Sequence, residues 1–330
     1  MRALQLLAYD GRPESVAIAD IPKPTPGPGE VLVKVAASPI NPSDLAFLSG
    51  LYGFKKPLPA TPGFEGSGTV VDNGSGLMAG YLRGKRVACT AADPKISGGM
   101  WAEYVVTSAQ LCVPLAKHVT DDQAAMMLVN PLSAWALVDI ARHRGDRAIV
   151  QTAAASALGR MVIRLCLRFQ IPLINIVRRS DQVDLLRHEG SEHVLNSADP
   201  NFDDALRDLA RKHSATVAFD AVAGELTARV LGAQPKHSRM LVYGGLSLSA
   251  VQIDPGSLIF EGKTVEGFWV SDWLARQSFV NKLRLSQRIQ SLIATDLKSE
   301  VRAKVPLDQA AGAIQQYARN MTVGKILITP

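Results

Sequence analysis

Residues 148–179 read AIVQTAAASALGRMVIRLCLRFQIPLINIVRR, and this stretch decides the fold of the chain. The apolar run Ala148–Gln151 predicts a buried strand, and a helical period replaces it over Arg160–Phe169. A second apolar run, Leu173–Val177, predicts another buried strand. Two strands joined by a helix of this length are typical of a βαβ unit in a parallel sheet.

A turn of small residues joins the first strand to the helix, and its chemistry suits a dinucleotide. The turn Ala153–Gly159 departs from the GxGxxG pattern, because Ala154 and Ser156 occupy the first two glycine positions and only Gly159 keeps the third. Backbone N–H groups at such a turn approach a pyrophosphate at the positive end of the helix dipole. A βαβ unit whose small residues serve packing alone is the alternative interpretation.

The end of the second strand indicates which dinucleotide would bind. It is followed by Arg178, Arg179 and Ser180, at the place where the ribose of a dinucleotide is recognised. An Asp or Glu there would select the 2′-hydroxyl of NAD, whereas two guanidinium groups and a helix-capping Ser180 suit a 2′-phosphate. NADPH is therefore the predicted cofactor, and a pair of solvated arginines is the alternative.

The rest of the chain shows two different patterns. Between residues 15 and 114, short β-branched runs are separated by Gly and Pro, which predicts an antiparallel, barrel-like domain. Further strands over Thr216–Asp220 and Met240–Tyr243 continue the strand–helix alternation and predict a doubly wound parallel sheet. The run Lys325–Ile328 predicts a last strand that rejoins the first domain. The expected domains are 1–118 together with 268–330, and 119–267 for the cofactor.

Composition excludes several classes of protein. The 36 Lys and Arg and 30 Asp and Glu are spread along the chain, so no nucleic-acid partner is expected. The three cysteines are widely separated and the six histidines form no HExxH motif, so neither a disulfide framework nor a metal site is predicted. A signal-peptide pattern and an apolar run of about 20 residues are both missing. We therefore expect a cytoplasmic protein without membrane contact.

Several short segments outside the βαβ unit carry a family resemblance. They are Asn41–Asp44, Gly50–Gly53, Val129–Pro131, Asn175–Arg178, and Gly267–Trp269 with Trp273. Together with the two-domain pattern they resemble the zinc-free medium-chain dehydrogenase/reductase superfamily of quinone oxidoreductases, and most specifically its mitochondrial-type 2-enoyl thioester reductases. The resemblance implies an α/β fold in which a Rossmann domain is inserted into a GroES-like, mostly antiparallel β-barrel catalytic domain.

The resemblance also bears on zinc. In zinc-dependent relatives a Cys ligand stands where this chain has Asn41, and a His ligand stands where it has Phe64. Neither residue replaces a thiolate–imidazole pair. Because zinc is the Lewis acid of alcohol oxidation in those relatives, alcohol dehydrogenase activity is not expected.

The residues of the active site follow from the resemblance and from the dinucleotide turn. Tyr52 is expected to be the proton donor or enolate stabiliser, Asn41 to help place it against the nicotinamide, and Trp269 to line the substrate cleft. Ordinary aromatic packing for Tyr52 and Trp269, and a turn role for Asn41, are the alternatives. The residues expected to bind the cofactor are Asn130, Ser133, Ser156, Ala157, Leu158, Gly159, Arg178, Arg179, Tyr243, Gly244, Gly245, Phe268, Trp269 and Lys325.

These residue types are coherent with the reduction of electron-poor alkenes. Hydride attack on the β-carbon of an alkene conjugated to a carbonyl leaves an enolate, which a phenol stabilises by a hydrogen bond or a proton. The leading interpretation is an NADPH-dependent, zinc-independent reductase of 2-enoyl thioesters carried by coenzyme A or an acyl carrier protein. An NADPH:quinone oxidoreductase is the alternative. From a different class, the alternative is an NADPH-binding regulatory or RNA-binding protein without turnover.

Two further segments suggest partners. Between Leu274 and Gln290 the only charged residues are Arg276, Lys282, Arg284 and Arg288, and we hypothesise that they attract the phosphates of coenzyme A or an acidic carrier protein. A solvated helix face is the alternative. Relatives often pair the edge strands of their cofactor domains, and Thr264–Val270 predicts such an edge, so a homodimer is expected.

Overall fold

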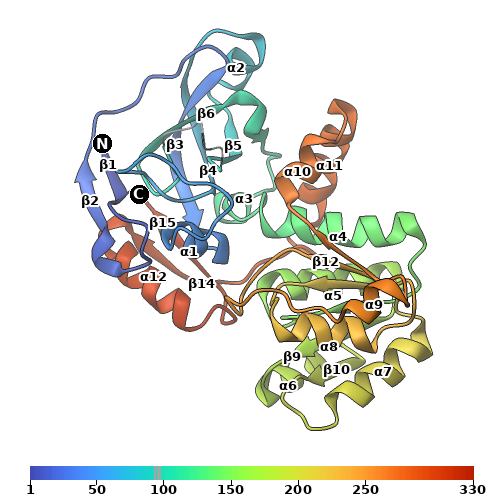
Figure 1. Ribbon diagram of the computed structural model, residues 1–330. Coiled ribbons are helices and arrows are strands. Elements are labelled where there is room, and N and C mark those ends of the chain that lie inside the picture. Colours follow the sequence, from blue (N-terminus) through green and yellow to red (C-terminus); the bar gives the residue numbers. More distant parts are fainter. Residues whose placement is uncertain (93, 95–97) are drawn as a thin grey trace. The chain divides into compact units, whose positions relative to one another are not determined.

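The computed structural model describes residues 1–92, 94 and 98–330, which form two compact units (Figure 1). The first unit consists of residues 1–131 and 283–330, and the inserted unit consists of residues 132–282. The sequence placed the two divisions at 118/119 and 267/268, and the structure places them later at both points. Helix α3 (Asp121–Ala125) explains the first difference, because it packs against the strands of the first unit.

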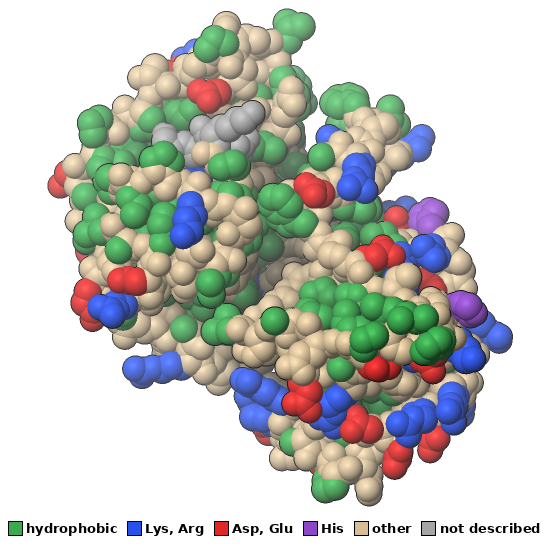
Figure 2. Space-filling view, viewed as in Figure 1, with side chains coloured by type: hydrophobic (Ala, Val, Ile, Leu, Met, Phe, Trp, Pro, Cys, Tyr) green, Lys and Arg blue, Asp and Glu red, His purple; other side chains and the backbone are tan. Residues whose placement is uncertain are grey.

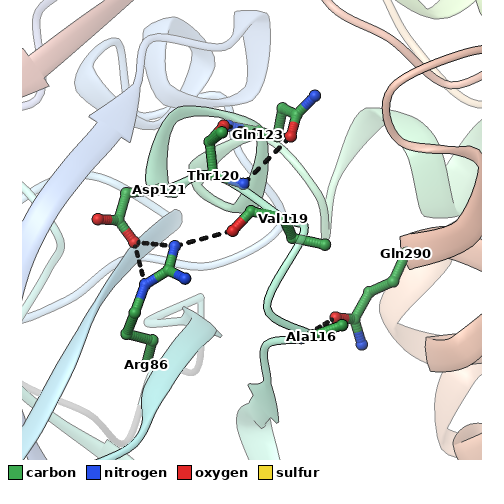
Figure 3. Close-up of polar contacts among 7 residues, drawn as sticks. All are labelled: Arg86, Ala116, Val119, Thr120, Asp121, Gln123 and Gln290. Carbon is green, nitrogen blue, oxygen red and sulfur yellow. Dashed lines mark hydrogen bonds and ion pairs between the residues drawn. The ribbon is translucent and has the colours of Figure 1, made fainter.

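Figure 3 shows the hydrogen bonds that hold residues 116–121 against the rest of the first unit. The Arg86 guanidinium donates from Nε and Nη2 to Asp121 Oδ1 over 3.0 and 2.7 Å, and from Nη2 to the carbonyl of Val119 over 2.8 Å. Farther along, the Ala116 N–H donates to Gln290 Oε1 over 2.7 Å. Since Gln290 lies in α11 (Phe279–Leu292), this bond also ties the second half of that helix to the first unit.

The described residues of the first unit form a sheet in the order β14-β15-β3-β4-β5-β7, with β6 paired to β3. Its neighbours are antiparallel except for the parallel pair β14 and β15, which confirms the predicted antiparallel character. The predicted last strand also pairs with β3 in the first unit, as expected. The strands of this sheet are β3 (Glu30–Pro39), β4 (Glu65–Asn73), β5 (Arg86–Thr90), β6 (Tyr104–Ser108), β7 (Cys112–Pro114), β14 (Val301–Pro306) and β15 (Lys325–Thr329). In the same unit, β1 (Arg2–Leu6) and β2 (Val16–Asp20) pair with each other in a separate two-stranded sheet.

Helices α1 (Pro42–Leu48) and α12 (Ala310–Arg319) cover an aromatic core in this unit. The rings of Phe47 and Phe64 meet edge to face at 5.3 Å. Trp101 is fully buried in the same cluster, and its indole N–H donates to the carbonyl of Pro39 over 3.3 Å. Helix α2 (Leu77–Leu82) belongs to a second, aliphatic cluster of the same unit.

The inserted unit is a parallel sheet in the order β10-β9-β8-β11-β12-β13. Counted along the chain this order is 3-2-1-4-5-6, the doubly wound arrangement that the sequence predicted. Its strands are β8 (Ile149–Gln151), β9 (Leu173–Val177), β10 (His193–Asn196), β11 (Val217–Asp220), β12 (Arg239–Val242) and β13 (Thr264–Gly267). The direction in which strands are added changes between β8 and β11, so their carboxyl ends form the switch point where ligands of such sheets bind.

Helices alternate with these strands as the sequence predicted, with one error at a cap. They are α4 (Asn130–Arg144), α5 (Ala157–Phe169), α6 (Ser180–His188), α7 (Phe202–His213), α8 (Glu225–Ala233), α9 (Pro255–Ile259) and α10 (Val270–Ala275). The expectation that Ser180 caps a helix was wrong. Ser180 is already the first helical residue of α6, and Arg179 is the cap, without a side-chain capping bond.

The described residues contain no helix that is long and apolar enough to cross a membrane.

Candidate active site

The small-residue turn of the inserted unit has the geometry of a glycine fingerprint with only one of its glycines. Ser156 caps α5, and its hydroxyl accepts a hydrogen bond from the N–H of Gly159 over 3.1 Å. A Cβ on Gly159 would lie 2.4 Å from the carbonyl oxygen of Ala154, so only glycine fits there. Ala153 takes a left-handed φ of 49°. The first N–H groups of α5 have no acceptor within the helix, and Ser156 already satisfies that of Gly159. The predicted residues Ser156, Ala157, Leu158 and Gly159 all lie at this end of the helix, where the helix dipole is positive.

The two predicted arginines lie at the carboxyl end of β9, and both are exposed. Arg179 pairs with Asp181, to which its Nε donates over 3.0 Å. This hydrogen bond from Arg179 lowers the pKa of the Asp181 carboxyl. Within the described part of the chain, the Arg178 guanidinium makes no hydrogen bond or ion pair. Arg178 is thus the arginine of the two that is available to a phosphate without breaking an existing pair.

A buried carboxylate that sequence reasoning missed organises the switch point. Asp220, at the end of β11, accepts hydrogen bonds from the hydroxyls of Thr152 over 2.7 Å and Thr227 over 2.6 Å. The N–H of Val222 donates to it over 2.9 Å. The sequence did hold a signal for this carboxylate. Thr152 directly follows the apolar strand β8, and Asp220 ends the neighbouring apolar strand β11. The carboxylate fixes the loop after β11 against the start of the dinucleotide turn.

The predicted segment Tyr243–Gly245 lies beside this carboxylate, directly after β12. The N–H of Tyr243 donates to the carbonyl of Asp220 over 2.8 Å. A Cβ on Gly244 would lie 2.8 Å from the carbonyl oxygen of Ala221, so the backbone passes close to the neighbouring loop. The Tyr243 hydroxyl is buried and, among the described residues, has no hydrogen-bond partner. Burial raises the pKa of this phenol well above its usual value, so it stays protonated.

Four more of the residues predicted to bind the cofactor lie in α4 and directly after β13. Ser133 is buried in the first turn of α4, and Asn130 is the buried first residue of the same helix, on the part that belongs to the first unit. Phe268 follows β13, and its N–H donates to the carbonyl of Val242 over 2.8 Å. Trp269 caps α10 and is 42% exposed. Their contacts with a cofactor stay a prediction.

In the first unit, Asn41 and Lys325 meet in a fully buried network. The Lys325 ammonium donates to Asn41 Oδ1, to the carbonyl of Ile40 over 3.3 Å, and to the hydroxyl of Tyr317 over 3.3 Å. The Asn41 Nδ2 donates to Glu65 Oε1 over 2.9 Å. Both ends of the Asn41 amide are therefore committed to buried partners, which fixes its orientation.

Two buried carboxylates complete this network, and sequence reasoning missed both. Glu65 Oε2 accepts hydrogen bonds from the N–H groups of Leu128 over 2.8 Å and Val129 over 2.9 Å, just before α4. Asp44 accepts from the N–H groups of Asn41 over 2.8 Å and Phe64 over 3.1 Å. Burial raises the pKa of Glu65, and it raises the pKa of Asp44 to about 7. The Lys325 charge acts in the opposite direction on both.

Tyr52 is a half-buried aromatic at the edge of the core. Its ring lies 4.5 Å from that of Phe64 and 5.1 Å from that of Phe54. Phe64 is the residue at which the resemblance drawn from the sequence expects a His ligand in zinc-dependent relatives, and the Tyr52 ring packs directly on it. The part of the chain that the structure describes holds no group of three His, Cys, Asp or Glu residues arranged for a metal ion.

Comparison with known proteins matches both units. The family model of the alcohol dehydrogenase GroES-like domain matches residues 27–117, and that of the zinc-binding dehydrogenase matches residues 157–288. The mitochondrial enoyl-[acyl-carrier-protein] reductase of Xenopus tropicalis is 30% identical over 275 residues, covering 81% of this chain and 76% of the relative. Its Arabidopsis thaliana counterpart is 29% identical over 325 residues, covering 94% and 85%.

A solved structure is similar as well. The crystal structure of a putative NADPH:quinone reductase from Mesorhizobium loti is 37% identical, with a TM-score of 0.93, and the match covers 100% of this chain and 98% of that chain. The resemblance drawn from the sequence and the predicted fold class are thereby confirmed. The chain belongs to the medium-chain dehydrogenase/reductase superfamily of oxidoreductases, in the group that contains the enoyl reductases and the quinone reductases.

Proposed function

We propose that the protein is an NADPH-dependent reductase that delivers a hydride to the β-carbon of 2-enoyl thioesters. The observation that carries this proposal is the setting of Tyr52, whose ring packs on Phe64 at 4.5 Å where zinc-dependent relatives hold a ligand. The site thus offers a phenol beside the residue at which the resemblance expects a metal ligand in those relatives. The similarity to enoyl reductases over most of the chain supports the same activity.

Zinc does not fit the residues of this site. The oxygen of the Asn41 amide accepts from the Lys325 ammonium, and its nitrogen donates to Glu65. A cation placed beside this ammonium would be repelled, and Phe64 has no donor atom. The reaction we propose is therefore independent of zinc.

A nicotinamide dinucleotide does fit the inserted unit. The N–H groups of the first residues of α5 would hold the pyrophosphate. Arg178 would hold a 2′-phosphate, and Arg179 would join it on leaving Asp181. Once bound, NADPH supplies the hydride. The preference for NADPH over NADH rests on these arginines, because an acidic residue would be needed to select the 2′-hydroxyl. Steady-state kinetics with both cofactors tests this preference.

The first unit would handle the charge that develops during reduction. Hydride addition at the β-carbon places negative charge on the thioester oxygen, and the Tyr52 phenol would stabilise it by a hydrogen bond or a proton. Asn41 is held by Glu65 and Lys325 and positions the backbone at the start of α1, which leads to the loop that bears Tyr52. In this proposal Asn41 acts through Tyr52 and not on the substrate.

The decisive experiment measures NADPH oxidation with crotonyl-coenzyme A, with a quinone, and with no acceptor. We expect Tyr52→Phe to lower kcat with crotonyl-coenzyme A by about 100-fold, the scale of one general acid. Tyr81→Phe is the matched control, because Tyr81 is an exposed phenol of the same unit. Full activity of Tyr52→Phe with crotonyl-coenzyme A would exclude the proposed role.

Quinone reduction is the second candidate, favoured by the 37% identity to the putative NADPH:quinone reductase. A quinone accepts hydride without needing a protein phenol to stabilise a thioester enolate. Turnover with the quinone that survives Tyr52→Phe, and no turnover of crotonyl-coenzyme A by the wild type, would favour this candidate. Tight NADPH binding without turnover of any electrophile would instead favour a regulatory or RNA-binding role.

We also propose a homodimer that forms through the inserted unit. Strand β13 ends the sheet and pairs only with β12 among the described strands. Figure 2 shows a group of green apolar side chains on this unit where Figure 1 draws α9, and Ile259 and Phe260 are 70% and 78% exposed. A second copy would cover both the edge and the apolar face. Analytical ultracentrifugation measures the oligomeric state of the wild type and of Phe260→Glu. A dimeric wild type and a monomeric variant would support the dimer, and a monomeric wild type would exclude it.

A separate proposal concerns the positively charged segment 274–290 and the part of the substrate that carries phosphate. Arg284 and Arg288 lie in α11, and we propose that they attract the phosphates of coenzyme A or of an acidic carrier protein. The double change of Arg284 and Arg288 to Glu should raise the KM for coenzyme A thioesters and leave kcat unchanged. An unchanged KM would exclude this role.

A further inference from the structure

Two buried amide side chains lie between the dinucleotide turn and the strand that leads to the arginines. Gln151 ends β8 and Asn175 lies in β9, and the two are paired in the register of these parallel strands. Gln151 Nε2 donates to Asn175 Oδ1 over 2.7 Å. Gln151 is fully buried and Asn175 is 1% exposed. Neither residue has a role in the function proposed above.

The pair connects more than two strands. Gln151 Nε2 also donates to the carbonyl of Gly159 over 3.1 Å, at the start of α5. On the other side, Asn175 Nδ2 donates to the carbonyl of His193, the first residue of β10, over 3.2 Å. A continuous chain of hydrogen bonds therefore runs from the dinucleotide turn through β8 and β9 to β10.

Stability alone does not explain why amides stand here. The Gln151 Oε1 is buried and has no hydrogen-bond partner among the described residues, which costs folding free energy. Two apolar side chains of similar size at these positions would be nearly neutral for stability, since the pair itself would leave no side-chain polar atom unpaired. What apolar side chains would not supply is a directional bond that fixes the turn relative to β9.

The hydrogen bonds of Gln151 link two places that would each hold a phosphate group of the cofactor. Gly159 belongs to the turn that would hold the pyrophosphate, and Asn175 lies three residues before Arg178, which would hold the 2′-phosphate. Both groups belong to one ligand, so the spacing between the two anchors decides whether they are engaged together. A rigid link between the anchors means that less conformational freedom is lost on binding.

We propose that Gln151 and Asn175 are positioning residues that set the spacing between the pyrophosphate anchor and the 2′-phosphate anchor of the NADPH site. This inference rests on the proposed NADPH site. The backbone bond from the Ala154 N–H to the carbonyl of Ile176, at 3.1 Å, keeps the turn attached to β9 when either amide is removed. The side-chain link acts beside it, at the helix end of the turn.

The test compares a ligand that uses both anchors with one that uses a single anchor. NADPH engages both, whereas adenosine 2′-monophosphate engages only the arginines. We expect Gln151→Leu to weaken the Kd for NADPH by about tenfold, the scale of one hydrogen bond, and to leave the Kd for adenosine 2′-monophosphate within about twofold. The kcat at saturating NADPH should be unchanged, because the reacting groups are not touched.

Thermal unfolding of the same variants separates positioning from stability. Gln151→Leu leaves Asn175 Oδ1 without a partner and should lower the Tm, while the double change Gln151→Leu with Asn175→Leu should recover the Tm but not the affinity for NADPH. Gln234→Leu is the matched control. Gln234 is also buried in the inserted unit, and among the described residues its Nε2 donates only to the backbone carbonyl of Ala215, over 3.0 Å. Its loss should therefore lower the Tm and leave the NADPH Kd unchanged.

Three outcomes would overturn the proposal. In the first, Gln151→Leu binds NADPH as tightly as the wild type, which refutes the link while leaving the NADPH site intact. In the second, both ligands weaken equally or the affinity recovers with the Tm in the double variant, so that the pair serves stability alone. In the third, the wild type does not bind NADPH, and the proposed function fails together with the link.

Discussion

Replacing Lys325 by Met is the most direct test of the buried network in the first unit. Lys325 is 1% exposed and its ammonium donates to Asn41, Ile40 and Tyr317. Methionine keeps much of the side-chain length but removes the charge that lowers the pKa values of Asp44 and Glu65. Because the change leaves buried groups without their partner, we expect it to cost about 3–5 kcal/mol of unfolding free energy at pH 8.

The pH dependence distinguishes lost charge compensation from lost packing. The pKa of Asp44 is raised to about 7, mainly by burial, so the native state holds this proton at pH values where the unfolded chain has released it. Stability therefore falls as pH rises from the unfolded value of Asp, about 4, through the native value. Without Lys325 the native pKa values of Asp44 and Glu65 rise further. The fall in unfolding free energy with rising pH then continues to higher pH. The difference between wild type and variant should thus be small near pH 5 and large near pH 8.

Urea unfolding at the two pH values measures this difference. Lys298→Met is the control, because Lys298 forms an exposed ion pair with Glu300 at 2.9 Å, and such pairs contribute at most about 1 kcal/mol. A Lys325→Met variant as stable as the wild type at pH 8 would refute the role of the ammonium. A loss of equal size at both pH values would show that packing, not charge, was removed.

Three further changes test the inserted unit. Gly159→Ala brings a Cβ to 2.4 Å from the Ala154 carbonyl, so we expect dinucleotide affinity to fall by more than about tenfold; unchanged affinity in a fluorescence titration would contradict the close approach. Arg178→Glu should raise the KM for NADPH by at least about tenfold and leave that for NADH nearly unchanged, and equal effects on both cofactors would place the 2′-phosphate elsewhere. Ala153→Gly relieves a left-handed φ of 49° and should raise the unfolding free energy by about 0.5–1 kcal/mol, whereas a lower Tm would show that the Ala153 methyl contributes to packing.

The sequence by itself determined the inserted sheet, while the dinucleotide chemistry of its turn stays a prediction. The strands around residues 149–151 and 173–177 are runs of apolar residues, and their period is a local property that can be read without knowing any contact. The single remaining glycine, Gly159, could be assigned to close packing from its place after a strand and before a helix. That Asn41 and Phe64 replace the Cys and His ligands of zinc-dependent relatives came from the family resemblance, and it stays a prediction.

Local pattern was less exact at helix ends and for buried polar groups. Ser180 was expected to cap α6, but the helix begins at Ser180 itself, because capping depends on backbone angles that neighbouring elements set. Asp220 and Glu65 were missed, since a lone acidic residue in a sequence does not reveal that hydroxyl and backbone donors converge on it.

Only the tertiary structure decided which residues share the buried network of the first unit. Lys325 meets Asn41 across 284 positions, and Glu65 holds the backbone of Val129 across 64. These meetings depend on the register in which β15 pairs with β3, where Leu327 faces Pro39 and Ile328 faces Ser38. Register between distant strands is set by the packing of the whole core, so no local pattern records it. The same packing removes the Lys325 ammonium and the carboxylates of Asp44 and Glu65 from water. Because of this burial, the charge of Lys325 affects the pKa values of both carboxylates.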